Sequence, residues 1–384
     1  MTSSILLFLA SLALSVLSSL VLAETLDRLG TRLAWPEGLV GIVTALGADA
    51  PEISAAVTAL QAGRADLGFG IVLGSNVFNL AALLGLSAVL AGKVRVHRLG
   101  LALAGGVALV VTVVVSALLL GGLGPVPAVV LLAVVLVPYA ALSSVRPGRE
   151  GLRGRAGRTP PTGGAGRAGP GLRTGGPGHA PPGLPTDGPG HPRPAPGHPR
   201  PDLRKDLRGR ASRVLLAAVA DISRDLRPAE AAPRATRHDV LTVVPALVSV
   251  VLGSVGMVHA AEILGHRWQV APVLVGTLVL ASLTSVPNAI AAGRLALRHR
   301  GSAVVSESFN SNTINLLVGI ALPTLVVGVA PATGLTRLSV WWLLAMTVAT
   351  LLLAGYQGGL DRREGVGIIA AYLAFVAVLV VSSA

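Results

Sequence analysis

Two stretches of the chain repeat a short polar pattern inside apolar sequence. The first reads Ala-Asp-Ala-Pro-Glu at residues 48–52 and Gly-Ser-Asn-Val-Phe-Asn at residues 74–79. The second reads Thr-Ser-Val-Pro-Asn at residues 284–288 and Asn-Ser-Asn-Thr-Ile-Asn at residues 310–315. The identical positions keep one offset, of 236 residues: Pro51 and Pro287, Ser75 and Ser311, Asn76 and Asn312, Asn79 and Asn315, Leu80 and Leu316. A constant offset without a gap indicates an internal duplication.

The composition around these stretches is that of a membrane protein. Of the 384 residues, 52% are hydrophobic and only 13% are charged, and the mean hydropathy is +0.71. A soluble domain carries about twice that share of charged residues. The absence of cysteine excludes disulfides and thiolate metal sites. The chain is therefore expected to be polytopic rather than water-soluble.

Apolar runs predict ten transmembrane helices, because each is long enough to cross about 30 Å of hydrocarbon. Five lie in the first part of the chain, at residues 5–23, 38–60, 67–91, 99–120 and 126–142. Five more lie at residues 241–264, 270–295, 303–327, 338–355 and 366–383. The first run could instead be a cleaved signal peptide ending at the Val-Leu-Ala of residues 21–23. No Lys or Arg precedes Arg28, however, so the basic start of a signal peptide is missing.

The basic residues of the short loops predict the orientation. If the N-terminus lies outside, the inner loops hold Arg28, Arg32, Lys93, Arg95, Arg98, Arg294, Arg298, Arg300, Arg362 and Arg363, and the outer loops hold Arg64, Arg267 and Arg337. This asymmetry places both termini outside and the loop between the halves in the cytoplasm. Each half has an odd number of spans, so the two copies enter the membrane from opposite sides. The expected fold class is all-α, built from two inverted-topology five-helix repeats.

Three segments follow from this layout. Residues 1–142 form the first transmembrane half, residues 143–239 a basic cytoplasmic loop, and residues 240–384 the second half. Residues 146–201 are rich in Pro, Gly and Arg and are expected to be disordered. Residues 202–226 could form an amphipathic helix on anionic lipid, or a solvated helix. Nothing in the loop resembles a nucleic-acid-binding motif.

The loop also carries three histidines, His179, His191 and His198. They could bind a transition metal loosely. Histidines scattered through a Pro/Gly tract are more often passive, so no metal is expected there.

The duplicated polar residues predict a cation site. Gly47 and Pro51 should interrupt the second span and Pro287 the seventh, because a proline frees a backbone carbonyl one turn earlier. Asp49 and Glu52 are three residues apart and share one helix face. Carboxylate, amide, hydroxyl and carbonyl oxygens suit sodium or calcium, and no imidazole or thiolate is present to favour zinc or copper.

The same residues have plainer explanations. An intramembrane carboxylate costs on the order of 3 kcal/mol even on the lenient insertion scale, but Asp49 and Glu52 could be hydrated near a helix end. Small polar residues also serve helix packing in bilayers, although their matched duplication argues against packing alone. Glu307 falls in the eighth span and could be a cavity carboxylate, a partner of an arginine, or an interfacial residue.

The Pro-Glu with Gly-Ser-Asn-Val-Phe-Asn, and its echo at Pro287 with residues 311–315, resemble the two alpha repeats of the calcium/cation antiporter superfamily, of the sodium/calcium exchanger type. The repeats would cover about residues 39–84 and 275–320. The resemblance implies ten helices and a central site made by spans 2, 3, 7 and 8. It implies Glu52 as the main calcium-binding carboxylate, with Ala48, Asp49, Ser75, Asn79, Thr284, Ser285, Asn288, Ser311 and Asn315 as further ligands.

The chain departs from the family pattern at several of these positions. Members usually have a second acidic residue at the position of Asn288, and many have one at Asn315. The usual Thr-Ser pair before the first Pro-Glu is replaced by Ala48 and Asp49. Both matched carboxylates therefore come from one half, which leaves the calcium selectivity and the coupling ion open.

The sequence thus predicts a cation antiporter of a bacterial inner membrane. It would exchange calcium for sodium or protons by alternating access, with no cofactor. One alternative is exchange of another cation, because amides favour less charged ions. Another is a non-transporting membrane scaffold that acts through its basic loop. An enzyme is not expected, because no arrangement of nucleophile, base and oxyanion donors is present.

Overall fold

The computed structural model describes residues 2–33, 35, 37–143 and 237–383. These residues belong to one compact unit, which the chain forms from residues 1–146 and 215–384. A second unit, residues 147–214, lies outside the described residues. The loop's candidate lipid-binding helix and its three histidines also lie outside them. Those features and the proposed segment limits stay predictions.

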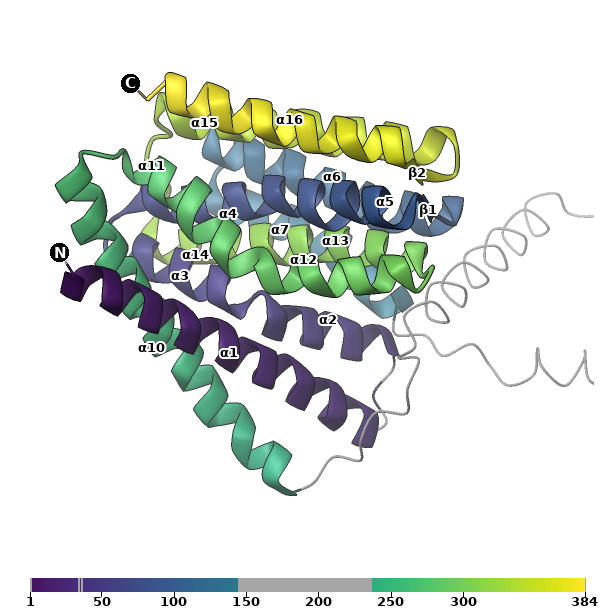
Figure 1. The fold of residues 1–384 in the computed structure, drawn as a ribbon, viewed down its shortest axis with the longest axis horizontal. Coiled ribbons are helices and arrows are strands. Elements are labelled where there is room, and N and C mark those ends of the chain that lie inside the picture. The colour runs from purple at the N-terminus through teal and green to yellow at the C-terminus, as the bar shows by residue number, and fades with distance from the viewer. Residues whose placement is uncertain (1, 34, 36, 144–236, 384) are drawn as a thin grey trace, which may run out of the picture. The chain divides into compact units, whose positions relative to one another are not determined.

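Helices make up nearly all of the described chain (Figure 1). The first half contains α1 (Thr2–Arg32), α2 (Glu37–Ala48), α3 (Ala50–Gln61), α4 (Ala65–Asn79), the π-helical η1 (Leu80–Gly85), α5 (Leu86–Ala91), the strand β1 (Lys93–Arg95), α6 (Arg98–Leu119) and α7 (Pro125–Ser143). The second half contains α10 (Arg237–Trp268), α11 (Pro272–Leu274), η2 (Val275–Leu280), α12 (Ala281–Leu297), α13 (Gly301–Leu316), η3 (Leu317–Ala321), α14 (Leu322–Val327), α15 (Gly334–Tyr356), β2 (Gly359–Asp361) and α16 (Arg362–Val381).

The all-α membrane fold predicted from the sequence is confirmed. Nine helical segments within the described residues are long and apolar enough to cross a membrane. The predicted second span is the tenth, and it is split into α2 and α3, each of 12 residues. Lipid offers no hydrogen-bond partners, so a spanning chain satisfies its backbone within helices. A split span therefore marks a place where protein groups or water meet the free backbone.

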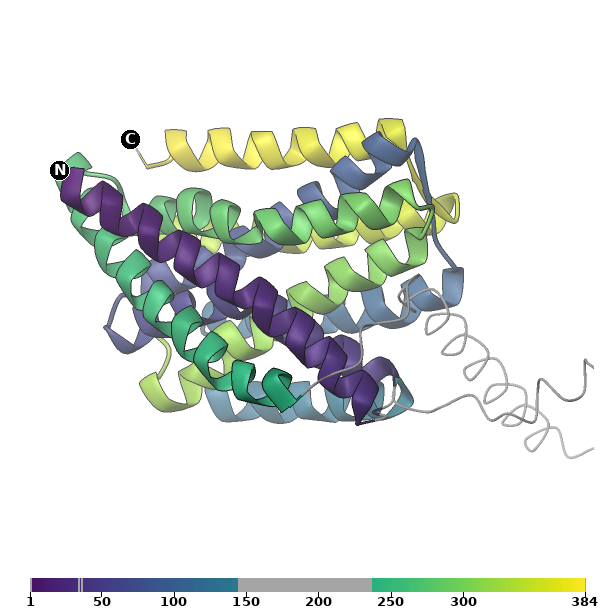
Figure 2. The same ribbon diagram turned by 60° about the horizontal axis from the view of Figure 1, so that its bottom comes forward.

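Both halves contain a π-helical turn directly after the duplicated Ser-Asn motif. In the first half η1 follows Asn79, and in the second half η3 begins at Leu317. A π-helical turn inserts one extra residue into a helix and is frequent at functional sites. The start of α1 and the end of α16 lie at one end of the bundle, opposite β1 and β2, in both ribbon views (Figures 1 and 2).

The predicted interruption at Pro287 is wrong. Helix α12 runs continuously through this proline, whereas Pro51 stands in the first turn of the new helix α3. A proline at a helix start removes no hydrogen bond from the helix, because an N–H in the first turn has no partner within the helix. Inside a membrane helix it removes one hydrogen bond, which neighbouring groups can compensate. The irregularity of the seventh span lies earlier, in η2.

Helix α4 occupies the centre of the unit. In the most apolar 18-residue stretch of the segment Ala65–Ala91, 89% of the residues are buried inside the protein, whereas the corresponding share for α7 is 11%. Gly74 allows the close approach of α4 to η2, since an added Cβ would lie 2.5 Å from the Cα of Thr277. Glycine at this crossing lets the two backbones touch. The helices that carry the duplicated polar residues are thereby packed together.

Helices α1 and α10 run side by side (Figure 2). The hydroxyls of Ser15 and Ser254 are 3.1 Å apart across this contact. An added Cβ on Gly253 would lie 2.7 Å from the backbone nitrogen of Ser15. The predicted first span is therefore a packed helix of the bundle.

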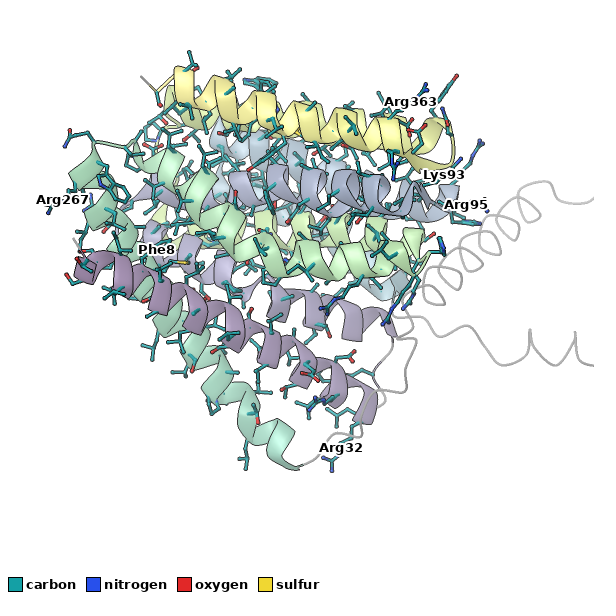
Figure 3. The ribbon with its side chains drawn as sticks, viewed as in Figure 1. Phe8, Arg32, Lys93, Arg95, Arg267 and Arg363 are labelled. Carbon is teal, nitrogen blue, oxygen red and sulfur yellow. The ribbon has the colours of Figure 1, made fainter. Side chains whose placement is uncertain are left out.

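One end of the bundle is basic. Here β1 and β2 pair antiparallel, with Val94 opposite Leu360. Figure 3 shows Lys93, Arg95 and Arg363 at this end and Arg267 at the other. Lys93, Arg95 and Arg363, which the sequence assigned to one membrane face, thus lie at the end opposite Arg267, which it assigned to the other.

Candidate functional site

The break between α2 and α3 places Asp49 inside the protein. Asp49 is the residue preceding α3, and its side chain is 1% exposed. Pro51 cannot donate to the preceding turn, and the new helix starts around it. Glu52, in the first turn of α3, is completely buried. Two carboxylates are therefore held at membrane depth by one irregularity of the backbone.

Asp49 is hydrogen-bonded by the second half of the chain. Its Oδ1 accepts from Nδ2 of Asn288 on α12 at 2.7 Å and from Oγ of Ser311 on α13 at 2.9 Å. Both donors are neutral. The contacts orient the carboxylate without compensating its charge.

Glu52 makes a similar contact to the second half. Its Oε1 accepts from Oγ of Ser285 at 2.9 Å. Ser254 on α10 donates to the backbone carbonyl of Pro51 at 3.3 Å, so α10 also reaches the start of α3. Helices α12 and α13 of the second half thus bond the two carboxylates, and α10 bonds the start of α3.

The duplicated asparagines meet at the centre. Nδ2 of Asn76 donates to the backbone carbonyl of Asn312 at 3.2 Å, and Nδ2 of Asn312 donates to the carbonyl of Asn76 at 3.1 Å. Asn76 and Asn312 are matched positions of the duplication. A reciprocal bond between equivalent residues is what a pseudo-two-fold axis between inverted repeats produces.

The symmetry stops at the next pair of asparagines. Nδ2 of Asn79 donates to Oγ of Ser311 and to Oδ1 of Asn312, both at 3.2 Å. The matched residue Asn315 is fully buried, and neither atom of its side-chain amide has a hydrogen-bond partner. The second half therefore contributes a free amide where the first half contributes a bonded one.

Several other buried polar atoms of the motif residues and of Glu307 lack a protein partner. They are Oδ2 of Asp49, Oε2 of Glu52, Oδ1 of Asn76, Oδ1 of Asn79 and Oε2 of Glu307. All five are oxygens. More than nine in ten buried polar groups in proteins are hydrogen-bonded, so a cluster of free oxygens is a feature that calls for a ligand. Oxygen donors of this kind suit a hard cation.

The remaining predicted ligands are present but face their own helices. Ser75 is fully buried and donates to the carbonyl of Val72 at 3.0 Å. Thr284 donates to the carbonyls of Leu280 and Ala281, at 2.9 and 3.2 Å. A hydroxyl that donates in this way keeps its lone pairs. Ala48 ends α2, is half-buried, and offers only its backbone.

The negative charge of the site has no positive partner. Within the described part of the chain, neither Asp49 nor Glu52 forms an ion pair, and the two carboxylates repel each other. A buried charge without a partner is strongly unfavourable. No group of three or more His, Cys, Asp or Glu side chains in the described ranges is close enough to hold a metal. A cation here would need hydroxyl, amide and carbonyl oxygens beside the carboxylates.

The sequence does not indicate every residue of this centre. The duplication marks Asn76 and Asn312 as equivalent, but it does not show that they pair with each other. Ser254 has no distinctive signal, because a single serine beside a glycine in an apolar helix commonly serves packing. Its role depends on a contact with a residue 203 positions away.

Comparison with known proteins identifies the family. The model of the sodium/calcium exchanger protein family matches residues 3–142 and 238–381. The chain belongs to this family. The resemblance seen in the repeated motifs is thereby confirmed, and the family is one of transporters.

Individual exchangers match shorter stretches of this family member. This chain is 28% identical over 153 residues to the sodium/potassium/calcium exchanger Nckx30C of Drosophila melanogaster. The aligned stretch covers 38% of this chain and 17% of that protein. The chain is also 28% identical over 152 residues to the human sodium/potassium/calcium exchanger 4, covering 37% of this chain and 24% of that protein. The aligned part thus spans a quarter or less of these relatives.

Two solved structures share the fold over nearly the whole chain. The H+/Ca2+ exchanger CAX gives a TM-score of 0.63 at 12% identity, over 99% of this chain and 86% of that one. The sodium-calcium exchanger NCX_Mj gives 0.56 at 17% identity, over 98% of both chains. At such identity the likeness concerns the fold alone.

Proposed function

We propose that this protein is a cation antiporter in which Asp49 and Glu52 bind calcium in one half of the cycle and sodium or protons in the other. The observation that carries the proposal is the buried pair itself, which is held by neutral donors from the second half and lacks a positive partner. A bound cation would compensate the charge that the protein leaves uncompensated. The family's exchangers supply the class of ion.

The other predicted ligands complete the proposed site. Free oxygens of Asn79 and Asn315 lie in the helices next to the carboxylates. Hydroxyls of Ser75, Thr284, Ser285 and Ser311 and the carbonyl of Ala48 would add neutral donors. Calcium takes six to eight oxygens at about 2.3–2.6 Å, and this set can supply that number.

Inverted repeats give the proposed transport cycle. Contacts from Asp49 and Glu52 to α12 and α13 join the two halves at the site. Rocking of one group of helices against another would open the site to each membrane face in turn. In the proposed orientation the basic end, with β1 and β2, faces the cytoplasm and both termini lie outside, in a bacterial inner membrane.

A second candidate is exchange of a cation other than calcium. Asn288 and Asn315 favour it, because both are amides at positions where the family usually or often carries acids. The side-chain amide of Asn288 donates a hydrogen bond to Asp49, so it adds no negative charge to the site. A site with fewer charges holds a divalent ion less tightly.

Gradient-driven uptake into proteoliposomes separates these candidates. Purified full-length protein is given calcium on one side and a sodium or a proton gradient across the membrane. Calcium uptake that follows one gradient, and is lost in Glu52→Gln and Asp49→Asn, supports calcium exchange and names the coupling ion. Uptake of sodium or potassium without calcium would support the second candidate, and no cation movement under either gradient would refute antiport.

A further inference from the structure

Glu307 is a half-buried carboxylate that the proposed central site does not use. It lies on α13, six residues after Gly301, with which the helix begins, and four residues before Ser311. Its side chain is half-buried, and Oε2 is fully covered and has no hydrogen-bond partner. Within the described ranges it has no ion-pair partner.

Glu307 is a neighbour of Asp49. Residues four apart on a helix lie on one face, and the next residue on this face, Ser311, donates to Asp49. Glu307 therefore lies one helical turn, about 6 Å along the axis, from the hydroxyl that bonds Asp49. At such a separation the two carboxylates, which come from opposite halves of the chain, would repel each other.

The packing of α13 bears on what Glu307 faces. The most extensive contacts of α13 are with α6, and it also packs on α4, α12 and α2. A charged side chain at membrane depth faces the protein interior or a water-filled space, because contact with hydrocarbon is too costly. A charged Glu307 would therefore face protein or water rather than lipid.

The direction of α13 shows on which side of the central site Glu307 lies. Gly301 lies against the backbone oxygen of Arg95 in β1, so the helix starts at the basic end of the bundle. With a rise of 1.5 Å per residue, Glu307 is about 9 Å from this start and about 6 Å before Ser311. It stands between the central site and the end that carries Lys93, Arg95 and Arg363 (Figure 3).

We propose that Glu307 and Asp49 form a second cation subsite, which an ion occupies on its way between the basic end and the central site. The inference rests on the proposed antiport, and its occupant is the same class of hard cation. The basic residues repel cations, and a carboxylate just inside them offsets that barrier. Glu307 also supplies, from the second half, a negative charge that Asn288 and Asn315 do not provide.

The test compares calcium uptake by the wild type, Glu307→Gln, Glu307→Asp and Glu262→Gln. Glu262 is the control, because it pairs at 2.8 Å with Arg64, which follows the far end of α3 from Glu52. Loss of one nearby charge should raise the calcium concentration for half-maximal uptake about tenfold in Glu307→Gln. Glu307→Asp keeps the charge and should stay close to the wild type, as should Glu262→Gln.

The outcomes separate this inference from the function on which it rests. Wild-type uptake that is lost in Glu52→Gln but has unchanged calcium dependence in Glu307→Gln would overturn the subsite and leave the antiporter intact. A wild type that moves no cation would overturn both. An equal loss in Glu307→Gln and Glu307→Asp would point to packing and would also overturn the subsite.

A second measurement needs no variant, in case Glu307→Gln does not fold. Wild-type protein is labelled with a hydrophobic carbodiimide, and the modified peptides are identified by mass spectrometry. Calcium or sodium should slow the labelling of Glu307 severalfold. Labelling of Glu307 that does not respond to either ion, while that of Glu52 does, would contradict the subsite.

Discussion

At the scale of single residues, the site is a pair of acids held by neutral donors. Asp49 and Glu52 accept hydrogen bonds from Asn288, Ser311 and Ser285, which are 233 to 262 positions away. The duplicated pattern predicted that these residues belong together. The pattern could not predict which side chains form hydrogen bonds with each other, because partners so far apart in the sequence depend on the packing of the helices. For the same reason the sequence left the role of Glu307 open.

The variant Asn288→Asp tests the charge balance. It places a third carboxylate where Nδ2 now donates to Asp49 at 2.7 Å. Without a cation, the repulsion should lower the melting temperature of the protein in detergent. Added calcium should raise it more than in the wild type, because a ligand that binds only the folded state stabilises it.

A charge added elsewhere serves as the control for this variant. Gln357 is exposed at the end of α15, so Gln357→Glu should melt like the wild type with and without calcium. If Asn288→Asp also behaves like the wild type, Asp49 does not carry an uncompensated charge.

At the scale of elements, the apolar runs predicted the spans well. Nine are continuous helices and the second is divided, close to the predicted Gly47 and Pro51. The π-helical turns η1, η2 and η3 were not predicted, because an inserted residue leaves the apolar pattern almost unchanged. The continuous course of α12 through Pro287 was not predicted either, since it depends on the groups packed around it.

The variant Gly74→Ala tests the crossing of α4 and η2. Its Cβ would meet the Cα of Thr277 at 2.5 Å, so the helices must separate. Overpacking of this kind typically costs about 1–3 kcal/mol. Thermal unfolding in detergent should show a lower midpoint than for the wild type.

The matched control for this crossing is Gly106→Ala on α6. A Cβ at Gly106 meets no atom within 4 Å, and alanine favours a helix by up to about 1 kcal/mol. Its midpoint should be unchanged or higher. Equal midpoints for Gly74→Ala and Gly106→Ala would mean that the helices do not cross as closely as described.

At the scale of the whole molecule, the arrangement of basic residues follows the topology predicted from the loops. The start of α1 and the end of α16 share one end, and Lys93, Arg95 and Arg363 lie at the other (Figures 1 and 3). An even number of crossings, such as the ten that the sequence predicts, would place both ends of the chain on one side. That the basic end faces the cytoplasm is a prediction of the positive-inside rule.

The lack of cysteine in the chain makes this orientation easy to measure. Single variants Ser382→Cys and Gln357→Cys add a thiol at opposite ends of the bundle, at exposed positions. A membrane-impermeant maleimide should label Ser382→Cys in intact cells and Gln357→Cys only after the membrane is opened. The reverse pattern would invert the orientation, and labelling of both in intact cells would contradict the span count.

In the proposed exchange, Asp49 and Glu52 bind the transported cation. The most direct test of this role is equilibrium binding of radioactive calcium to the purified protein in detergent, with sodium or protons as competitors and Glu262→Gln as the control. We expect saturable calcium binding that the coupling ion displaces. The control Glu262→Gln should retain this binding, and both Glu52→Gln and Asp49→Asn should lose it. Binding that persists in both of those variants would contradict the role of the two carboxylates.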